Sequence, residues 1–401
     1  MPKPPSCLAG LDIGSTATRC VVAIEENGRL RCVGYGAARS DGWKKGVIVD
    51  QDPVVQSIEQ AVAEAEADGA ASIESAVVGV GSTVSSAVSR GAAPLSSGVP
   101  IERLHVNEAV KAATRARLGE DRMLLQALPL EFAVDGQEGV RNPLGMTGRR
   151  LEAIVRLVTA STQAHNNLTT VVNRAGIVVE ETIFEPFAGA FAAISEQERQ
   201  MGVAVADFGA GSTGLAAYLE DHLRVATSIP IGGDHFTRDV SYGLRTSEAG
   251  AARLIEQYGC AVSGMTAENS KIEIPSTGPG GGLREASRRT LNEILESRAE
   301  ELCVYIDKEL ERAGVAGRLI AGLVLSGGVA KLTGFADMAE RVLRLPVRIG
   351  LPVPLCELPE ELDRPEWTTA LGLLLYAQRL RLHRQAERES MTAWLRGIFG
   401  H

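Results

Sequence analysis

Two aspartates, Asp12 and Asp207, each follow an apolar segment and precede a short turn of glycine, serine and threonine. The first segment begins at residue 8 and reads LAGLDIGSTATRCVV, and the second begins at residue 203 and reads VAVADFGAGSTGLAAYL. Each pattern predicts a β-hairpin whose turn presents backbone N–H groups and hydroxyls. Because the pattern occurs twice, we expect two lobes built on one plan, each offering a hairpin to a shared cleft.

Turns of this composition suit phosphate groups, because phosphates need several N–H donors at short range and only loops with small side chains bring them close. The two aspartates can hold Mg²⁺ through water, since magnesium keeps much of its hydration shell. A third glycine turn follows the apolar run AGLVLS, where adenosine would pack against the backbone. The residues that these patterns assign to a nucleotide are Asp12, Gly14, Ser15, Thr16, Asp207, Gly209, Gly211, Ser212, Thr213, Gly232, Gly233, Gly327 and Gly328.

Composition limits the class of protein. A chain of 401 residues exceeds one ordinary core, and 45% apolar with only 4% aromatic residues is typical of a packed α/β protein. A net charge of −9 argues against general nucleic-acid binding, which needs a basic face. Six cysteines without a CxxC pair and six histidines without HExxH argue against a zinc site. With no signal peptide and no apolar run of roughly 18 residues, we expect a cytoplasmic protein.

The chain alternates between helical and strand-like patterns, which favours an α/β fold. Apolar spacing predicts helices over residues 52–70, 107–118, 163–175 and 288–313. The polar, Gly- and Pro-rich stretch 268–284 predicts a loop or a hairpin.

The three glycine turns, in this order, resemble the two phosphate motifs and the adenosine motif of the actin, Hsp70 and sugar-kinase superfamily. The segments FEPFAGAFAA (184–193) and WTTALGLLLYA (367–377) resemble its two connecting helices. The resemblance implies an actin-like ATPase fold, with two lobes of duplicated ribonuclease-H-like subdomains that bind ATP and Mg²⁺. It also places Glu185 where several members have an acidic residue that orients the attacking water, which would make Glu185 catalytic. The alternative is that Glu185 only begins a helix together with Pro186.

The segment 124–160 indicates which family within this superfamily the chain resembles. It closely resembles the extra subdomain of FtsA, and it follows that family's pattern through Pro129, Asp135, Gly139, 141–143 (RNP) and Gly145. The resemblance implies a cell-division protein that polymerises through this inserted subdomain and tethers FtsZ filaments to the cytoplasmic membrane at the division site, together with other divisome proteins. The alternatives are a pilus-assembly actin homologue and a small-molecule kinase, although kinases of this superfamily lack the block.

Two positions depart from the ATP-binding relatives. A helix in this lobe usually offers Glu-x-x-Lys to the ribose and adenine, whereas Ala252 and Ile255 stand at those positions here. We expect Arg253 or Glu256 to substitute, and Arg19 to act where relatives often carry a phosphate-binding lysine. The nucleotide is therefore expected to be mainly structural or regulatory, with slow hydrolysis at most.

The predicted helix 288–313 carries Arg288, Arg289 and Arg298. In FtsA the equivalent region helps to receive the acidic, apolar C-terminal peptide of FtsZ, so the resemblance assigns these arginines to partner binding. The alternative is a solvated helix face on which they pair with glutamates, such as Glu293, one turn away.

The residue pattern of the C-terminal segment itself predicts an amphipathic helix, almost independently of the family resemblance. An apolar stripe at helical spacing is formed by Met391, Trp394, Leu395, Ile398 and Phe399. Residues 379–401 hold five arginines and two glutamates, so this end is basic in an acidic protein. A basic amphipathic helix with Trp and Phe suits an anionic membrane surface, and the alternative is docking onto the protein itself or a partner groove.

These observations divide the chain into five parts. The expected parts are a first lobe (1–84, 161–195 and 364–378), an inserted FtsA-type subdomain (85–160), a second lobe (196–231 and 314–363), a peripheral partner-binding subdomain of the second lobe (232–313), and a linker with the membrane-targeting helix (379–401).

Overall fold

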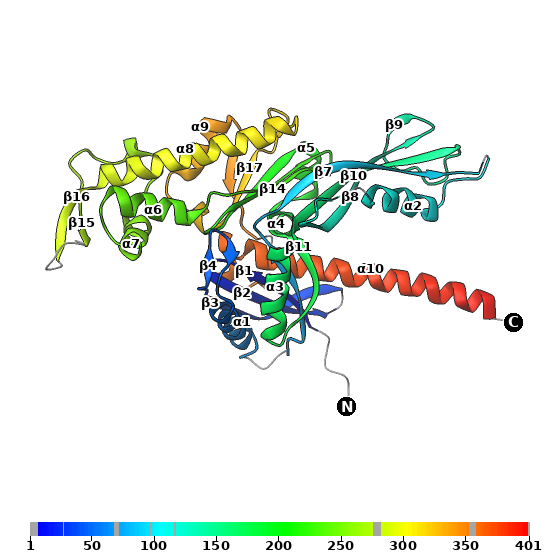
Figure 1. The fold of residues 1–401 in the computed structure, drawn as a ribbon, viewed down its shortest axis with the longest axis horizontal. Coiled ribbons are helices and arrows are strands. Elements are labelled where there is room, and N and C mark those ends of the chain that lie inside the picture. Colours follow the sequence, from blue (N-terminus) through cyan, green and yellow to red (C-terminus); the bar gives the residue numbers. More distant parts are fainter. Residues whose placement is uncertain are drawn as a thin grey trace.

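The computed structural model describes residues 7–26, 28–67, 72–96, 98–115, 118–275, 282–352 and 358–399, and from 386 onward it describes the backbone alone. In Figure 1 the first lobe lies below an elongated upper layer, which has the second lobe at its centre. The inserted subdomain forms one end of that layer and the peripheral helices form the other. No helix in the described ranges combines the length and the apolar character that crossing a membrane requires.

The first lobe is built on a five-stranded sheet in the order β11-β6-β1-β2-β3. β2 is antiparallel to its neighbours β1 and β3, while β6 runs parallel to β1 and β11 runs parallel to β6. The strands are β1 (Leu8–Ile13), β2 (Ala17–Glu26), β3 (Arg29–Arg39), β6 (Ser75–Val80) and β11 (Val178–Phe184).

The second lobe repeats this plan. Its sheet has the order β14-β13-β12-β17-β18, with three antiparallel strands followed by two parallel additions. The strands are β12 (Val203–Phe208), β13 (Thr213–Leu219), β14 (His222–Ile229), β17 (Leu323–Gly327) and β18 (Val347–Ile349). Both hairpins predicted from the aspartate turns are present, as β1–β2 and β12–β13. Read from β18, the second sheet has its equivalent strands in the same order as the first sheet read from β11, which confirms the predicted duplication.

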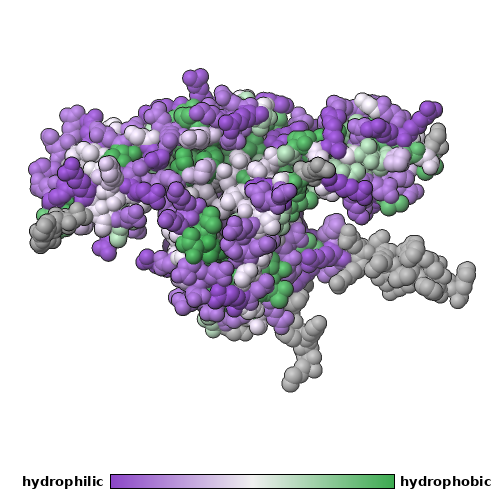
Figure 2. Space-filling view, viewed as in Figure 1, coloured by the Kyte–Doolittle hydropathy of each residue, from purple (hydrophilic) through white to green (hydrophobic). Residues whose placement is uncertain are grey.

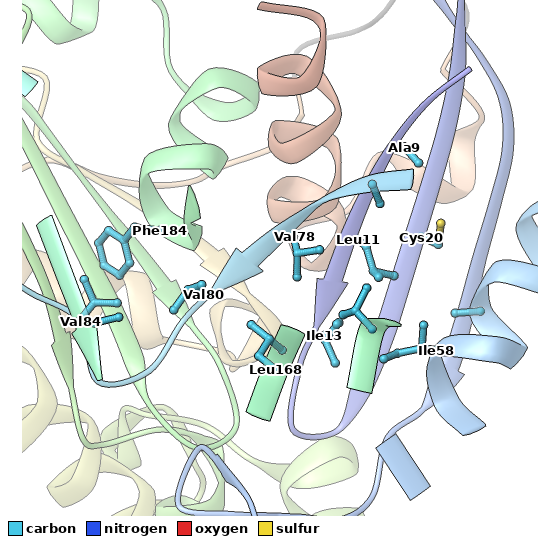
Figure 3. Packing of buried hydrophobic residues seen from close by; sticks show 14 of the residues in the cluster. Ala9, Leu11, Ile13, Cys20, Ile58, Val78, Val80, Val84, Leu168 and Phe184 are labelled. Atoms are coloured by element: carbon cyan, nitrogen blue, oxygen red, sulfur yellow. The ribbon is translucent and has the colours of Figure 1, made fainter. Parts of the chain in front are cut away.

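Helices cover both faces of the first sheet. On one face α1 (Gln51–Ala65) and α3 (Thr162–Arg174) cover the sheet, where Ile58 of α1 and Leu168 of α3 share a buried cluster with Leu11 of β1 (Figure 3). On the other face α4 (Glu185–Ala193) and α10 (Thr368–Phe399) lie between the two sheets. A Cβ atom on Gly10 would lie 2.4 Å from the carbonyl oxygen of Ala370, so glycine in β1 is what lets α10 approach the sheet.

The inserted subdomain leaves the first lobe after β6 and returns to it at α3. Its sheet has the order β7-β10-β8-β9, and α2 packs on one face through a core that includes Ala109 and Val155. The helix predicted over 107–118 begins four residues earlier. The elements are β7 (Ser85–Pro94), α2 (Arg103–Thr114), β8 (Arg122–Val134), β9 (Gln137–Val140) and β10 (Arg150–Ser161).

The peripheral part of the second lobe lies between β14 and β17. The helix predicted over 288–313 is confirmed as α8 (Arg288–Arg312), which begins where the side chain of Ser287 accepts a hydrogen bond from the Thr290 N–H. The polar stretch before it forms a hairpin, as one of the two predicted possibilities. The other elements are α6 (Gly233–Gly243), α7 (Glu248–Tyr258), β15 (Lys271–Pro275) and β16 (Leu283–Ser287), with α5 (Glu196–Met201) and α9 (Phe335–Leu343) elsewhere in the lobe.

The C-terminal segment 379–401 was expected to form a linker followed by a separate helix, but in the structure it continues one long helix. α10 continues without a break from Thr368 to Phe399, and in Figure 1 it runs out from between the lobes beneath the inserted subdomain. The physical reason is local, because residues 379–390 contain no Gly or Pro and consist mostly of good helix formers. Beyond the second connecting helix, Arg379 packs over the Phe191 ring at 4.8 Å and Arg384 pairs with Glu180 at 3.4 Å.

Candidate functional site

A cavity of about 610 Å³ lies between the two lobes. Its walls come from the turns of both aspartate hairpins, the start of α6, α7, and the segment after β17. This volume lies in the range of sites that bury a small-molecule ligand. Most of the sequence-predicted residues are brought together here, although they come from segments far apart in the chain.

The first turn presents Asp12 and Arg19 to the cavity. They are directly opposite each other in the β1–β2 register, and Arg19 Nη1 lies 3.9 Å from Asp12 Oδ2. Gly14 N–H donates to the Ala17 carbonyl at 3.0 Å and closes the turn. The N–H groups of Ser15 and Thr16 have no acceptor among the described residues, so they remain available to a ligand.

The second turn is held against the start of α6. Gly233 N–H donates to the Gly209 carbonyl at 3.0 Å, and Asp234 N–H donates to the Ala210 carbonyl at 2.9 Å. Within the described structure, the N–H groups of Ala210 and Gly211 have no acceptor, just as in the first turn. The carbonyl oxygens of Gly209 and Ala210 are thus used inside the protein, while N–H groups of residues that line the cavity are left without an acceptor, which suits a phosphate.

Two residues predicted to contact the nucleotide lie behind this turn. Thr213 is fully buried, and its hydroxyl donates to the Ile231 carbonyl at 2.7 Å. Gly232 does not line the cavity either. A Cβ atom there would lie 2.5 Å from the Ala210 oxygen, so Gly232 lets α6 approach the turn. Both residues position the phosphate turn and do not reach the cavity.

A hairpin that sequence analysis missed closes over the second turn. It consists of β4 (Trp43–Lys44) and β5 (Val47–Ile48), and a Cβ atom on Gly211 would lie 2.5 Å from the Gly46 nitrogen. The Gly46 carbonyl accepts a hydrogen bond of 2.7 Å from Ser82 Oγ. Figure 2 shows a mostly hydrophilic face with a compact hydrophobic patch near the junction of the lobes. The glycine at the tip lets the first lobe touch the second at the phosphate turn.

Three carboxylates meet at the base of the cavity. Burial raises the pKa of Asp12 to about 7, because the charge of Arg19 only partly offsets desolvation and the charge of Asp207 adds to it. Burial also raises the pKa of Glu185 well above its usual value, and Asp12 and Asp207 raise it further. The pKa of Asp207 is raised by burial, against which a hydrogen bond of 2.9 Å from Thr369 acts.

Glu185 both begins α4 and lines the cavity. Its side chain lies against the end of β6, where a Cβ atom on Gly81 would be 2.0 Å from Glu185 Oε2. Within the described residues, no three Asp, Glu, His or Cys side chains are placed to hold a metal ion by themselves. Asp12 and Asp207 suit a cation bound through water, because both carboxyl groups line the cavity beside the turn N–H groups, Asp12 buried and Asp207 half-buried.

The third glycine turn forms another wall of the cavity, next to Asp207. Gly327 has a φ of 80°, and a Cβ atom there would lie 2.6 Å from Asp207 Oδ1. At Gly328 a Cβ atom would meet nothing within 4 Å, so this position leaves room for a ligand. On α7 the cavity is lined by Ala252, Ile255 and Glu256. Arg253, the other expected substitute, does not line the cavity.

An ion pair that sequence analysis did not predict lies near this third glycine turn. Lys331 Nζ pairs with Glu366 Oε1, and both side chains line the cavity. The second carboxylate oxygen of Glu366 is buried and has no hydrogen-bond partner among the described residues. Lys331 follows the glycine turn and Glu366 precedes α10, so the pair joins the second lobe to the connecting segment.

The arginines of α8 lie away from the cavity and are engaged with their own chain. Arg288 Nε donates to the Tyr258 carbonyl at 3.0 Å, and Arg289 pairs with Glu268 at 2.9 Å and with Glu293 at 3.4 Å. Arg298 Nε lies 2.6 Å from Asp239 Oδ2 on α6. Intramolecular pairing, the alternative considered above, is thus present at Arg289 and Arg298.

The tail stripe lies outside the described side chains. Met391, Trp394, Leu395, Ile398 and Phe399 belong to the helical backbone of α10, where only the backbone is described. Their expected role therefore remains a prediction.

Comparison with known families gives two matches. Residues 204–372 match the family model described as cell division protein FtsA, and residues 81–159 match an SHS2 domain inserted in FtsA. The chain is 35% identical to cell division protein FtsA of Pseudomonas aeruginosa, over 96% of this chain and 91% of that one. It is 32% identical to the protein of the same name from Escherichia coli K12, over 98% of this chain and 96% of that one.

Solved structures are similar at the level of the fold. A PilM–PilN type IV pilus biogenesis complex gives a TM-score of 0.66 at 18% identity, covering 92% of this chain and 98% of that one. MreB5 of Spiroplasma citri bound to ADP gives 0.56 at 13% identity, covering 94% and 99%. The likeness confirms the predicted actin-like fold, in which two related lobes enclose a cavity.

Proposed function

The chain belongs to the FtsA family of cell division proteins, and from this premise we propose that it binds Mg-ATP between its lobes, polymerises, and tethers FtsZ filaments to the cytoplasmic membrane. The observation that carries the proposal is the pair of glycine turns whose N–H groups face one cavity from both lobes. A triphosphate between them would be held by both lobes at once. Nucleotide binding then closes the cavity.

We assign different parts of the bound Mg-ATP to different residues of the cavity. The N–H groups of Ser15, Thr16, Ala210 and Gly211 bind phosphate oxygens, and Arg19 adds a positive charge at the first turn. A Mg²⁺ ion held through water by Asp12 and Asp207 would neutralise phosphate charge. The solved MreB5 structure, whose title names ADP, supports a nucleotide in this fold.

We propose that turnover is slow. Glu185 lies at the base of the cavity and would orient a water molecule, but its pKa is raised by burial and by two neighbouring carboxylates. A protonated carboxyl cannot accept a proton from water. At the base-binding wall, Ala252 and Ile255 provide neither the charge nor the hydrogen bonds that Glu-x-x-Lys would supply. The nucleotide therefore acts mainly as a structural ligand.

Three surfaces would serve the partners. The inserted subdomain would contact the next protomer, and α8, with Arg288, Arg289 and Arg298, would receive the FtsZ C-terminal peptide. The end of α10 would lie on an anionic membrane surface. A single short helix binds reversibly, whereas a polymer presents many helices at once and gains firm attachment through multivalency. The match to the inserted FtsA domain supports this function over the kinase and pilus-assembly alternatives.

A co-sedimentation experiment tests the proposal. The full chain, with Mg-ATP, is centrifuged with vesicles that contain anionic lipid, in the presence of a labelled FtsZ C-terminal peptide. We expect the protein and the peptide to sediment together with the vesicles, and the peptide to remain in the supernatant when the protein is left out. Sedimentation of neither the protein nor the peptide would contradict the tethering function.

A further inference from the structure

The short segment from Gly81 to Val84 joins the first lobe to the inserted subdomain. It follows β6 and precedes β7, and the inserted subdomain returns to the first lobe after Ser161. Gly81 and Ser82 line the central cavity, whereas Val84 is buried in the cluster of Figure 3, which also holds Phe184. The segment therefore runs from the wall of the cavity to the root of the inserted subdomain.

The first half of the segment lies beside Glu185 and beside the hairpin that closes over the second phosphate turn. A Cβ atom on Gly81 would be 2.0 Å from Glu185 Oε2, so that carboxyl group lies against the segment. Ser82 Oγ donates a hydrogen bond of 2.7 Å to the carbonyl of Gly46, whose nitrogen lies close to Gly211 of the phosphate turn. Both neighbours belong to the part of the cavity assigned above to the phosphates and the attacking water.

This half of the segment also has hydrogen-bond donors to spare. Among the described residues, the N–H groups of Gly81 and Ser82 have no acceptor. Around them, the Gly81 carbonyl and the Ser82 hydroxyl are already engaged with other parts of the protein. Free N–H groups on consecutive residues at the wall of a cavity suit an anionic oxygen, as in the two phosphate turns.

Ser228 of β14 holds both ends of the segment from the second lobe. Its Oγ donates to the Gly81 carbonyl at 2.6 Å and accepts from the Val84 N–H at 3.3 Å. The Ser228 N–H donates to the Val84 carbonyl at 3.0 Å. These hydrogen bonds fix the segment to a strand of the second lobe, although the chain enters it from the first.

Thr83 connects the segment to the inserted subdomain in a strained conformation. Its φ of 60° lies in the left-handed region, which β-branched residues rarely adopt. Its carbonyl accepts a hydrogen bond of 2.7 Å from Arg122 of β8, and its Oγ1 accepts one of 3.4 Å from the N–H of Ser161, the last residue of β10. A strained conformation persists only while the surrounding contacts determine it, so Thr83 responds to a change at its neighbours.

We propose that the segment 81–84 senses the terminal phosphate of the nucleotide and transmits its presence to the inserted subdomain. The proposal rests on the Mg-ATP binding proposed above. The terminal phosphate accepts hydrogen bonds from the N–H groups of Gly81 and Ser82 and holds the segment against the cavity. With ADP these N–H groups lose their acceptor and the segment shifts. Ser228 and Thr83 then carry the shift to β14 and to the ends of β8 and β10.

The first test compares the affinities of the full chain for ADP and for a non-hydrolysable ATP analogue, both with Mg²⁺, by calorimetry. Ser228→Ala removes the two hydrogen bonds of the hydroxyl, and Ser228 does not itself line the cavity. We expect the analogue to bind at least about fivefold more weakly and ADP to bind unchanged. Ser89→Ala is the matched control, because its hydroxyl donates to the Ala113 carbonyl at 2.8 Å inside the inserted subdomain. The control should keep both affinities.

The second test follows the inserted subdomain by hydrogen–deuterium exchange. In the wild type, the amides of β7, β8 and β10 near the segment 81–84 should exchange more slowly with the ATP analogue than with ADP. This difference should disappear in Ser228→Ala and remain in Ser89→Ala. The wild-type comparison needs no variant, so it decides the question even if Ser228→Ala proves unstable in thermal unfolding.

The outcomes separate this proposal from the one on which it rests. If the wild type binds neither nucleotide, Mg-ATP binding is wrong and the sensor is wrong with it. If the wild type binds both, and Ser228→Ala changes the two affinities equally or not at all, Mg-ATP binding stands and the sensor is overturned. Equal exchange of the wild type with the two nucleotides would overturn the transmission to the inserted subdomain.

Discussion

Thr369 Oγ1 donates a hydrogen bond of 2.9 Å to Asp207 Oδ2 and so joins the first turn of α10 to the phosphate turn of the second lobe. Asp207 ends a strand of one lobe, while α10 packs on the sheet of the other. The carboxylate assigned to Mg²⁺ is therefore positioned by the helix that connects the lobes. Thr369 is buried and Asp207 is half-buried, so the hydrogen bond is partly shielded from water.

The first prediction concerns the two aspartates. Asp12→Ala and Asp207→Ala should each weaken Mg-ATP binding by at least about tenfold, because the cation loses a ligand for its water shell. Isothermal titration measures the affinity, and Asp41→Ala, which removes an exposed carboxylate near the same lobe, is the control. Wild-type affinity in both variants would show that the cavity is assigned wrongly. Hydrolysis by the wild type should stay well below about 1 per second.

The second prediction concerns a glycine that no ligand touches. Gly232→Ala should weaken ATP binding, because its Cβ atom would lie 2.5 Å from the Ala210 oxygen and 2.7 Å from the Ser212 nitrogen and so displace the phosphate turn. Gly264→Ala is the matched control, since a Cβ atom there would meet nothing within 4 Å. Equal affinities of the two variants would mean that the turn tolerates displacement.

The third prediction separates the loss of one partner from the loss of both at the Lys331–Glu366 pair. Lys331→Met leaves a largely buried, unpaired carboxylate at the wall of the cavity that the anionic nucleotide enters, so ATP binding should weaken by about one order of magnitude. Adding Glu366→Gln removes the unpaired charge and should restore part of the affinity. Calorimetry on the single and double variants measures this coupling, and the absence of any recovery would place the effect on Lys331 alone.

The sequence could predict the parts of the cavity that a local pattern specifies. The hairpins at Asp12 and Asp207 were predictable because an apolar run followed by a small-residue turn is a short-range signal. Gly46, Thr369 and Glu366 were missed because each reaches the cavity only through tertiary packing.

Two kinds of expectation were wrong for physical reasons. Thr213 looked like a phosphate contact because it follows the turn, but strand alternation turns its hydroxyl inward to Ile231. The segment 379–390 was expected, from the family resemblance, to be a short and only partly helical linker. Nothing in its composition interrupts a helix, and α10 continues through it.

The fourth prediction tests whether Arg298 contacts the FtsZ peptide or only supports α8. Arg298→Glu should weaken peptide binding and leave ATP affinity unchanged. It also breaks the 2.6 Å pair with Asp239, so a second variant combines it with Asp239→Arg to restore an ion pair of reversed polarity. If Arg298 contacts the peptide, binding stays weak in the double variant, as fluorescence anisotropy with a labelled peptide would show. Recovery in the double variant would assign Arg298 a structural role.

The fifth prediction concerns the end of α10. Replacing Trp394 and Phe399 together by Glu should leave nucleotide binding intact and abolish sedimentation with anionic vesicles. Each apolar side chain would contribute on the order of 1–3 kcal/mol on burial, and two new negative charges add repulsion. High salt should weaken the wild-type interaction only in part, since it screens the arginines but not apolar burial.

The control for this variant is Val178→Glu combined with Ile320→Glu, which adds the same charge at side chains 61% and 68% exposed outside the inserted subdomain and α8. The control protein should still sediment with vesicles. Loss of the folded circular-dichroism signal in the tail variant, with the control folded, would place the stripe in the protein core.

Because α10 is unbroken, a small rotation of the first lobe becomes a larger displacement at the far end of the helix. Its first turn contacts the cavity at Asp207, its next turns pack on the first sheet, and its 32 residues span about 48 Å from root to tip. A rotation of the first lobe of only about 5° would therefore carry the far end of the helix through about 4 Å. A small change in cleft closure, too slight to alter any contact within a lobe, becomes a displacement of atomic size at the C-terminus.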